Sequence, residues 1–469
     1  MPEICVQRKT DMALIISASG IRGTVEGPAG DHLTPKDTLE WVAAWGLWLV
    51  ERYGKAAVVV GQDARPSGEV LRPIVIQTLR ALGHTVYDAG LTTTPTLAMA
   101  IPLYEAKGGV MLTASHNPPG WNALKLLDAA GEFFPPEVIR EVESYRSHLS
   151  FTNTDHPPSI ERGDRALSHH IGSILRHPWI HRQLIEQSRF RIVIDGCNSS
   201  GGVFVPALLE SLGVSDLVCL NCEPTGIFHH PPEPLPENLT ELAEKVRSSG
   251  AHLGIAVDPD VDRVVFFLPD GRPFSEEYTL VALSDYALQQ QKGPIVANQS
   301  TTMAVRWVAE QHGVGFYESR VGEYYVVQKM KAVGAVLGGE GNGGIILPTL
   351  HYGRDALAGI ALFLSYLART GGDASALRAR YPDLYMVKGK LTLSTHQPLP
   401  SDLWHRLREK APDAEASTED GLKLRWKEAW VHIRPSGTEP LIRIIAEAPT
   451  AAEAEALRSR WEKALLNLL

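Results

Sequence analysis

Three stretches of this chain begin with the same order of patterns, an apolar strand followed by an amphipathic helix. They start at residues 56, 190 and 293. In the first, the apolar run AAVVVGQD (56–63) precedes a helical period over 67–83 and a further strand over 84–90. Regular alternation of strands and helices is typical of α/β units built on parallel or mixed sheets. The pattern therefore predicts a repeated α/β module.

The C-terminal part differs in kind from the rest of the chain. Residues 422–437 and 441–448 alternate like antiparallel strands, and 451–469 form an amphipathic helical pattern. A length of 469 residues suggests about three domains, and four are compatible with it. We predict an α/β protein with three similar domains on mixed sheets and a C-terminal α+β domain, separated by polar breaks near 147–164, 268–277 and 370–385.

Composition excludes several classes of protein. The net charge of −9 argues against nucleic acid as a partner, and no apolar run approaches the roughly 18 residues that span a membrane. The N-terminus lacks a signal-peptide core, and four scattered cysteines do not form a disulfide framework. We expect a cytoplasmic protein with reduced thiols and a small-molecule partner; its oligomeric state stays open.

The segment TASHNPPGWNALK (113–125) is the first candidate for chemistry. It follows the apolar run 109–112, so it lies where a strand ends. Ser115, His116 and Lys125 then bring a hydroxyl, an imidazole and an ammonium to one loop, as a nucleophile or phosphoryl carrier requires. The alternative is an ordinary Ser/Asn turn after a strand.

A second candidate is the acidic string DPDVDR (258–263), which follows an apolar strand directly. In extended chain the carboxylates of Asp258, Asp260 and Asp262 would share one face, and such hard oxygen ligands suit Mg²⁺. An EF-hand is excluded because its sixth and twelfth positions would be Arg263 and Pro269 instead of Gly and Glu. An acidic surface turn remains the alternative, and Arg263 is a natural partner for phosphate.

A third candidate is the glycine-rich stretch 333–347. Gly339, Gly341 and Gly344 match a dinucleotide fingerprint formally, but another strand follows Gly344 instead of a helix. We therefore expect Glu340 and Asn342 to bind hydroxyl groups on a loop that a ligand approaches closely. A glycine-rich turn without a ligand is the alternative.

The fourth candidate is HIRPSGTEPLIRI (432–444), a tight turn between two strands. A guanidinium, hydroxyls and free backbone N–H groups form a phosphate-binding nest, and a plain hairpin turn is the alternative. The residues concerned are Arg434, Ser436, Gly437, Thr438 and Arg443.

These four candidate segments resemble, in the same order along the chain, the four signature loops of the α-D-phosphohexomutase family. The segments are TASHNP, DPDVDR, GGEGNGG and RPSGTEP. Further similar segments are SASGIRGT (17–24), GQDARPSG (61–68) and 223–239. The resemblance implies four domains around a central active-site cleft, each supplying one loop. The predicted domains are 1–155, 156–268, 269–372 and 373–469.

The resemblance also implies a role for each loop. Ser115 would carry a phosphoryl group, and Mg²⁺ would be held by Asp258, Asp260, Asp262 and a phosphate oxygen on Ser115. Arg22, His116, Lys125 and Arg263 would surround the transferred group. Glu340 and Asn342 would hold the sugar, and the loop from Arg434 to Thr438 with Arg443 the other phosphate. A hexose 1,6-bisphosphate would be the intermediate and activator.

One departure from the family pattern limits what the resemblance implies. Many bacterial members have Ser and His where this chain has Asn342 and Gly344, and the GEGNGG form resembles archaeal-type members. The general base therefore stays open among Lys125, His116 and the metal-bound phosphate. We expect glucosamine phosphate as substrate, with glucose and mannose phosphates as alternatives. A Mg²⁺-dependent phosphatase and a non-catalytic sugar-phosphate-binding protein are the other classes.

Overall fold

The computed structural model describes residues 14–151, 157–393, 399–436 and 441–469. The chain divides into two compact units. The first combines the residues up to Pro273 with Leu350–Gly372, and the second combines Phe274–Thr349 with Asp373–Leu469. Within the described ranges, no helix is long and apolar enough to cross a membrane.

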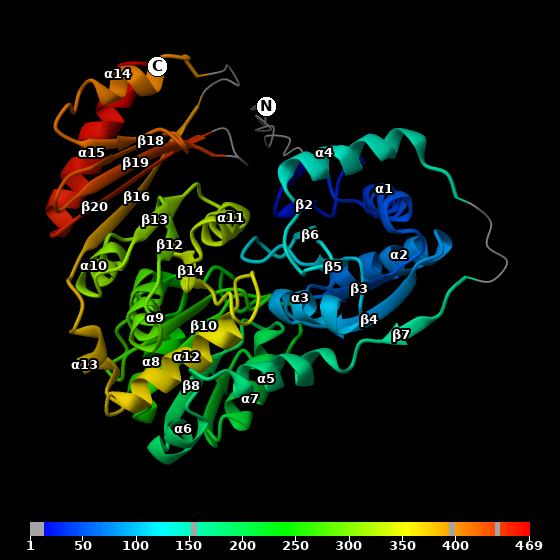
Figure 1. Cartoon of the computed structure of the whole chain (residues 1–469), viewed down its shortest axis with the longest axis horizontal. Helices are drawn as coiled ribbons and strands as arrows, with labels where there is room; N and C mark the ends of the chain where they lie inside the picture. The colour runs from blue at the N-terminus through cyan, green and yellow to red at the C-terminus, as the bar shows by residue number, and fades with distance from the viewer. Residues whose placement is uncertain (1–13, 152–156, 394–398, 437–440) are drawn as a thin grey trace, which may run out of the picture. The chain divides into compact units, whose positions relative to one another are not determined.

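The N-terminal sheet of the first unit has seven strands. These are β1 (Ile15–Ser17), β2 (Gly20–Thr24), β3 (Ala57–Gln62), β4 (Thr85–Leu91), β5 (Gly109–Leu112), β6 (Trp121–Leu127) and β7 (Ile160–Arg162). Their order is β1-β2-β6-β5-β3-β4-β7, and β3 is parallel to both β4 and β5 (Figure 1). The strand β3 lies inside the sheet, between β5 and β4, and its β-branched residues suit a buried, pleated surface.

Four helices and a short 3₁₀ turn accompany this sheet. They are α1 (Pro35–Tyr53), α2 (Ser67–Ala81), α3 (Thr94–Leu103), α4 (Pro136–Ser144) and η1 (Tyr145–His148). Thr34 and Asp37 form a capping box that starts α1, which places Trp41 and Trp45 in the core.

The second sheet of the first unit consists of β8 (Arg191–Asp195), β9 (Asp216–Leu220), β10 (Leu253–Val257) and β11 (Val264–Phe267), in the order β11-β10-β8-β9. Its helices are α5 (Ala166–Arg176), α6 (Arg182–Ser188), α7 (Gly201–Ser211), η2 (Pro236–Asn238), α8 (Thr240–Ser249) and α12 (Ala356–Arg369). The helix α12 is apolar almost all round and is buried beside α5, α6 and α7 (Figure 1). The three described cysteines, Cys197, Cys219 and Cys222, are free.

The second unit also contains two sheets. The first has β12 (Ile295–Asn298), β13 (Phe316–Ser319), β14 (Leu337–Glu340) and β15 (Gly344–Ile346), with α9 (Glu276–Gln290), α10 (Ala304–Gln311) and α11 (Glu323–Val333). The second is wholly antiparallel and has β16 (Tyr385–Thr392), β17 (Glu415–Ser417), β18 (Leu422–Arg425), β19 (Trp430–Pro435) and β20 (Leu441–Ala448). Its helices are α14 (Leu403–Arg408) and α15 (Ala451–Leu466), whereas the short helix α13 (Ala374–Arg378) contacts α9.

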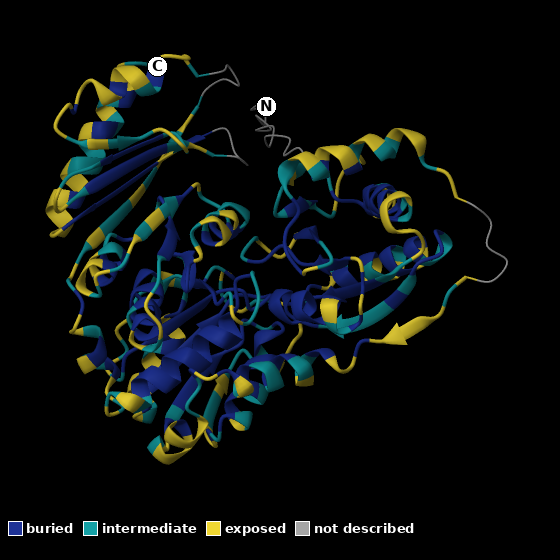
Figure 2. Ribbon diagram, viewed as in Figure 1, coloured by how far each residue is buried: buried dark blue, intermediate teal, exposed yellow. Residues whose placement is uncertain are grey.

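The predicted fold class is confirmed, with three α/β sheets and a C-terminal α+β domain. The interior strands of the sheets are buried, whereas the edge strands β7 and β16 and the outer helix faces are largely exposed or half-buried (Figure 2). The helix α10 starts only at Ala304, although β12 already ends at Asn298. Asn298 holds the preceding turn, because its Oδ1 accepts hydrogen bonds from Ser300 N and Thr301 Oγ1.

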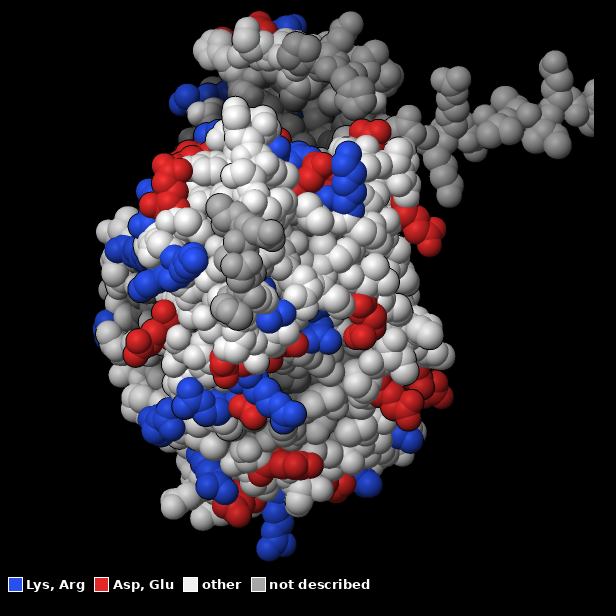
Figure 3. Space-filling view, turned by 90° about the vertical axis from the view of Figure 1, so that its right-hand side faces the viewer, with Lys and Arg blue, Asp and Glu red and all other residues white. Residues whose placement is uncertain are grey.

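Charge is mixed on the surface. On the face that Figure 3 shows, lysine and arginine side chains are interspersed with acidic ones. No broad patch of one sign is visible among the described residues of that face, which fits the modest net charge.

Candidate active site

Ser115 lies three residues beyond the end of β5 and is buried. Its Oγ donates a hydrogen bond to Asp258 Oδ2 over 2.6 Å, and the Nδ1 of His116 lies 3.4 Å from Ser115 Oγ. Its φ is +49°, in the left-handed region that residues other than glycine seldom occupy. Strained backbone of this kind persists only where the surroundings hold it, often at functional sites.

The surroundings that hold Ser115 form a ring of hydrogen bonds through Asp63, Arg65 and Thr113. Ser115 N donates to Thr113 Oγ1 over 2.9 Å, and this hydroxyl donates to Asp63 Oδ2 over 2.7 Å. Arg65 closes the ring, since its Nε donates to Asp63 Oδ2 over 3.2 Å and its Nη2 to Ser115 O over 2.6 Å. The ring thus fixes the N–H and C=O groups of Ser115 on both sides of the strained φ.

The Arg65 guanidinium also holds the rest of the loop. Fully buried, it donates to three more backbone carbonyls, those of Asn117, Pro118 and Trp121. This role of Arg65 was not among the predictions from the sequence, in which GQDARPSG (61–68) stands out only by its resemblance to a family segment. A buried Asp-x-Arg after an apolar strand is the available signal, because a buried guanidinium needs several acceptors.

We expect Arg65→Lys to lower kcat by about 100-fold, the order that a small misplacement of a reacting group costs. Lysine has three donors on one atom and cannot span the carbonyls that the planar guanidinium bridges. KM should change little, since Arg65 contacts only the chain. Steady-state kinetics with Arg72→Lys as the control, a half-buried arginine of α2, would test this. An unchanged kcat would contradict the positioning role.

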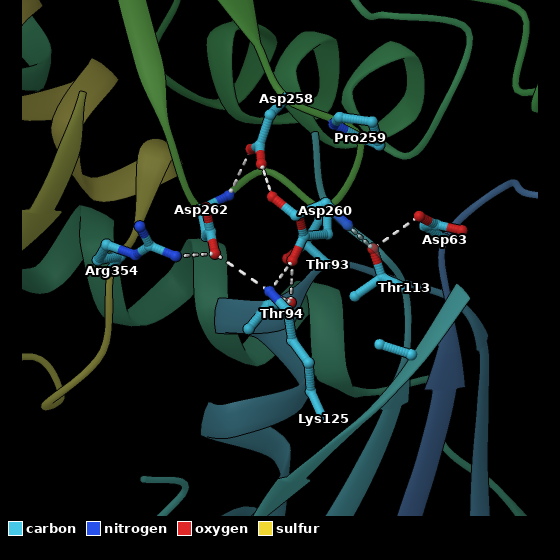
Figure 4. Close-up of polar contacts among 12 residues, drawn as sticks. Asp63, Thr93, Thr94, Thr113, Lys125, Asp258, Pro259, Asp260, Asp262 and Arg354 are labelled. Atoms are coloured by element: carbon cyan, nitrogen blue, oxygen red, sulfur yellow. Dashed lines mark hydrogen bonds and ion pairs between the residues drawn. The ribbon is translucent and has the colours of Figure 1, made fainter. Parts of the chain in front are cut away.

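The three aspartates form a buried cluster after β10 (Figure 4). One carboxylate oxygen of each lies within 4.8 Å of those of the other two. The prediction that extended chain aligns them is wrong, because residues 258–263 form a turn in which Val261 has φ +60°. Asp258 Oδ1 stabilises the turn by accepting hydrogen bonds from the N–H groups of Asp262 and Arg263, each over 3.1 Å.

Cations from distant parts of the first unit neutralise this cluster. Lys125 Nζ, on β6, donates to Asp260 Oδ2 over 2.6 Å and to Asp262 Oδ2 over 3.2 Å. Arg354 Nη2 donates to Asp262 Oδ2 over 2.7 Å, and Thr94 Oγ1 donates to Asp260 Oδ2. The roles of Arg354 and Thr94 could not be predicted from the sequence, because no local pattern marks them as partners of an aspartate turn.

The cluster shifts the pKa values of its members in opposite directions. Burial, then Asp262 and Asp260, raise the pKa of Asp258 well above its usual value. Burial alone would raise the pKa of Asp262, but Arg354, Lys125 and Arg263 lower it below its usual value. Burial would likewise lower the pKa of Lys125, but Asp260 and Asp262 raise it, so this ammonium keeps its proton.

The donor set fits a hard dication. Asp260 Oδ1 and Asp262 Oδ1 are buried and accept no hydrogen bond from any described residue. Buried carboxylate oxygens are costly without a partner, and oxygen ligands of this kind are those that Mg²⁺ prefers. The cluster can therefore bind a metal ion.

Arg22, Arg263 and His116 lie around the same cluster. Arg22 Nη1 donates to Asn117 Oδ1 over 2.9 Å, and Arg263 Nε lies 3.7 Å from Asp262 Oδ1. Burial and the neighbouring Arg263 lower the pKa of Arg22 to about 10. Burial, Arg263 and Arg22 together hold the pKa of His116 well below its usual value, so its imidazole is neutral.

The predicted sugar loop lies in the second unit, on the hairpin between β14 and β15. Glu340 Oε1 accepts hydrogen bonds from Asn298 Nδ2 over 2.8 Å and Gly322 N over 3.1 Å. Asn342 Oδ1 accepts from Gly344 N over 3.2 Å. Because β15 returns antiparallel to β14, no helix follows the glycines, and the dinucleotide interpretation stays excluded.

The predicted phosphate nest lies on the hairpin between β19 and β20. Arg434 Nε donates to Asp420 Oδ2 over 3.1 Å, and Ser436 N donates to Leu441 O over 2.8 Å. Arg443 on β20 pairs directly with Arg434 across the strands. Gly437 and Thr438 lie outside the described residues.

Comparison with known proteins identifies the class of the fold and site. Four family models match in order: the alpha/beta/alpha domains I, II and III of phosphoglucomutase/phosphomannomutase over 13–152, 169–271 and 275–385, and the C-terminal domain over 402–464. The fold is that of the phosphohexomutases, which are isomerases. The chain belongs to the phosphoglucomutase/phosphomannomutase family.

Individual relatives cover nearly the whole chain. A Methanopyrus kandleri protein named "Probable phosphoglucosamine mutase" is 35% identical, over 96% of this chain and 97% of the relative. A Thermococcus kodakarensis phosphoglucomutase/phosphomannomutase is 32% identical, over 94% and 96%. The crystal structure of a Burkholderia thailandensis phosphoglucomutase/phosphomannomutase family protein matches with a TM-score of 0.81 and 26% identity, over 96% and 98%.

Proposed function

We propose that this protein interconverts hexose 1-phosphates and 6-phosphates through a phosphoryl group carried on Ser115. One observation carries the proposal: Ser115 Oγ donates directly to Asp258 of a buried three-aspartate cluster that also binds Lys125. A hydroxyl, a set of hard metal ligands and an ammonium are the groups that phosphoryl transfer requires at one point.

Mg²⁺ is the cofactor that we propose for this cluster. Asp258, Asp260 and Asp262 would hold it together with an oxygen of the phosphoryl group on Ser115. A bound Mg²⁺ supplies positive charge to phosphoryl oxygens. Without a dication, a phosphoserine dianion beside three carboxylates would be strongly repelled, even with Lys125 present.

In the proposed cycle, a free hydroxyl oxygen of a hexose monophosphate attacks the phosphorus on Ser115. The bond from phosphorus to Ser115 Oγ breaks, the proton of the attacking hydroxyl is passed on to Ser115 Oγ, and a hexose 1,6-bisphosphate results. The bisphosphate then reorients. Ser115 Oγ attacks the phosphorus of its other phosphate, the bond from this phosphorus to the sugar oxygen breaks, and the proton of Ser115 passes to that oxygen. These changes restore phosphoserine and leave the isomeric monophosphate. Added bisphosphate would act as an activator by phosphorylating Ser115.

The basic residues of the first unit have separate roles in this proposal. Arg22, Lys125 and Arg263 stabilise the charge of the transferred group. His116 is the proposed proton acceptor, because its imidazole is neutral and lies beside Ser115, whereas Lys125 is held protonated by Asp260 and Asp262. The sequence left three candidates open for the general base, and this proposal selects His116 among them.

The residues of the second unit bind the rest of the substrate in this proposal. Glu340 and Asn342 hold sugar hydroxyls, and the nest from Arg434 to Thr438 holds the phosphate that is not transferred. Register supports the anion site, since Arg434 on β19, Arg443 on β20 and Lys390 on β16 are directly opposite one another across three strands. Three basic side chains in one register row form a strip of positive charge, which suits a phosphate group.

We expect Arg434→Ala to raise KM by roughly tenfold to a hundredfold, since a hydrogen bond to a charged group contributes about 1.5–3 kcal/mol. The phosphate it binds is not transferred, so the loss should fall mainly on substrate binding. Arg408→Ala, which removes an exposed arginine of α14, serves as the matched control. Equal KM values for the wild type and Arg434→Ala would contradict the proposal that Arg434 binds the phosphate that is not transferred.

The proposed substrate is glucosamine phosphate, with glucose and mannose phosphates as alternatives. The names of the relatives cover all three sugars. ³¹P NMR would test this with the purified protein, Mg²⁺, a trace of hexose 1,6-bisphosphate and each 6-phosphate in a separate tube. Appearance of the 1-phosphate is the expected result, fastest for glucosamine. Accumulating inorganic phosphate would indicate a phosphatase, and unchanged spectra would indicate a binding protein.

The domain limits 1–155, 156–268, 269–372 and 373–469 are part of the same proposal, as is a cytoplasmic location. Limited proteolysis tests the limits, because cleavage should concentrate at exposed linkers between domains.

A further inference from the structure

A second cluster of metal-ligating side chains lies in the first unit and shares no residue with the three aspartates. It consists of His170 on α5, His351 before α12 and Asp355 at the N-cap of α12. Asp355 Oδ2 lies 2.8 Å from His170 Nε2 and 3.1 Å from His351 Nε2. One ligand atom from each residue lies within 4.8 Å of the other two.

The three side chains are buried or nearly so, and two of them are oriented by further contacts. His170 is 0% exposed, Asp355 is 1% exposed and the side chain of His351 is 9% exposed. His170 Nδ1 lies 2.9 Å from Thr96 Oγ1, and Asp355 Oδ1 accepts a hydrogen bond from Ala358 N over 3.0 Å. Partners of this kind orient the ligands of protein metal sites.

We propose that His170, His351 and Asp355 bind a transition-metal dication, with Zn²⁺ as the best-fitting ion. Two imidazole nitrogens and one carboxylate oxygen suit Zn²⁺, whereas Mg²⁺ prefers oxygen ligands alone. Bonds of about 2.0–2.1 Å in tetrahedral geometry separate neighbouring ligand atoms by about 3.3 Å. The two histidine–aspartate distances therefore need to widen by only a few tenths of an ångström, and water can fill the fourth position.

Protons balance in this binding step. Where an imidazole donates from Nε2 to Asp355, it would give up that proton on binding the ion through Nε2 and keep a proton only on Nδ1. Thr96 Oγ1 can then accept a hydrogen bond from the Nδ1–H of His170. His351 Nδ1 is buried and has no hydrogen-bond partner among the described residues. His351 is therefore the weaker ligand, and we expect an exchangeable ion.

The position of the cluster connects the ion to the candidate active site. Arg354 lies between His351 and Asp355 in the chain, and its Nη2 donates to Asp262 Oδ2 over 2.7 Å. An ion bound to both ends of the segment 351–355 and to α5 would hold the backbone that presents Arg354. The ion would thus have a structural role, in holding this segment to α5, and not the role of a second catalytic metal.

Zinc binding by the full-length protein tests the proposal. Chelator-treated protein is dialysed against Zn²⁺ in excess Mg²⁺, and zinc per chain is measured by elemental analysis together with Tm. We expect about one zinc per chain and a raised Tm for the wild type and for the control His169→Ala, the adjacent half-buried histidine of α5. His351→Ala should lose both effects. Equal zinc binding by His351→Ala, or none by the wild type, would overturn the proposal.

X-ray absorption at the zinc edge of the wild type gives a second test that needs no variant to fold. Imidazole scattering from two histidines is the expected signature. Ligation by oxygen alone would place the zinc at the aspartate cluster and reject the second site. In that case His170, His351 and Asp355 form a metal-free hydrogen-bonded triad.

Discussion

Ser115→Ala should abolish mutase turnover, with a loss on the order of 10⁴-fold or more, as expected for a lost nucleophile. The variant lacks the Oγ that carries the phosphoryl group, and no other described hydroxyl donates to Asp258. The fold should persist, because the hydrogen bonds of Ser115 to Thr113 and Arg65 use its backbone. Turnover measured by ³¹P NMR, with far-UV circular dichroism to check folding, tests this expectation.

The control for this variant is Ser144→Ala, which removes an exposed hydroxyl on α4. It should keep full activity. Intact-mass measurement after incubation with hexose 1,6-bisphosphate adds an independent readout. The wild type should gain one phosphoryl group and Ser115→Ala none. Substantial turnover by Ser115→Ala would rule out the phosphoserine cycle, whatever its mass shows.

Lys125→Met should lower both activity and stability. Removing one partner of a buried ion pair costs about 3–5 kcal/mol, because the remaining charge stays buried without compensation. Here Asp260 and Asp262 both lose the ammonium that lies between them. We expect a fall in Tm of roughly 5–15 °C and a loss in kcat of about 10²–10³-fold, as for other lost electrostatic contacts to a transition state.

The dependence of Tm on Mg²⁺ distinguishes a loss of charge compensation in Lys125→Met from a simple packing defect. A dication at the aspartates replaces the missing positive charge, so Mg²⁺ should raise the Tm of Lys125→Met by more than that of the wild type. Differential scanning fluorimetry over a Mg²⁺ titration measures the difference, with Lys107→Met as the exposed-lysine control. If Mg²⁺ raises both Tm values equally, Lys125 does not compensate the aspartate charge.

Most of the fold could be predicted from the sequence because its patterns are local. The β-branched run of β3, the helical period of α2 and the alternation in β19 and β20 each specify an element within a short window. The turn at 258–263 was misjudged because the left-handed φ of Val261 is rare for a β-branched residue. No propensity argument would have placed it there.

The sequence by itself determined the types of chemistry: a loop hydroxyl at Ser115, three carboxylates on one turn and arginines on a hairpin. Only the tertiary structure decided which groups meet. One buried cluster brings together polar atoms of residues that are far apart in the chain, namely Thr94, Lys125, Asp262 and Arg354. The physical reason is that burial forces each charge to find partners, and the partners available depend on how the elements pack, which no short sequence window contains.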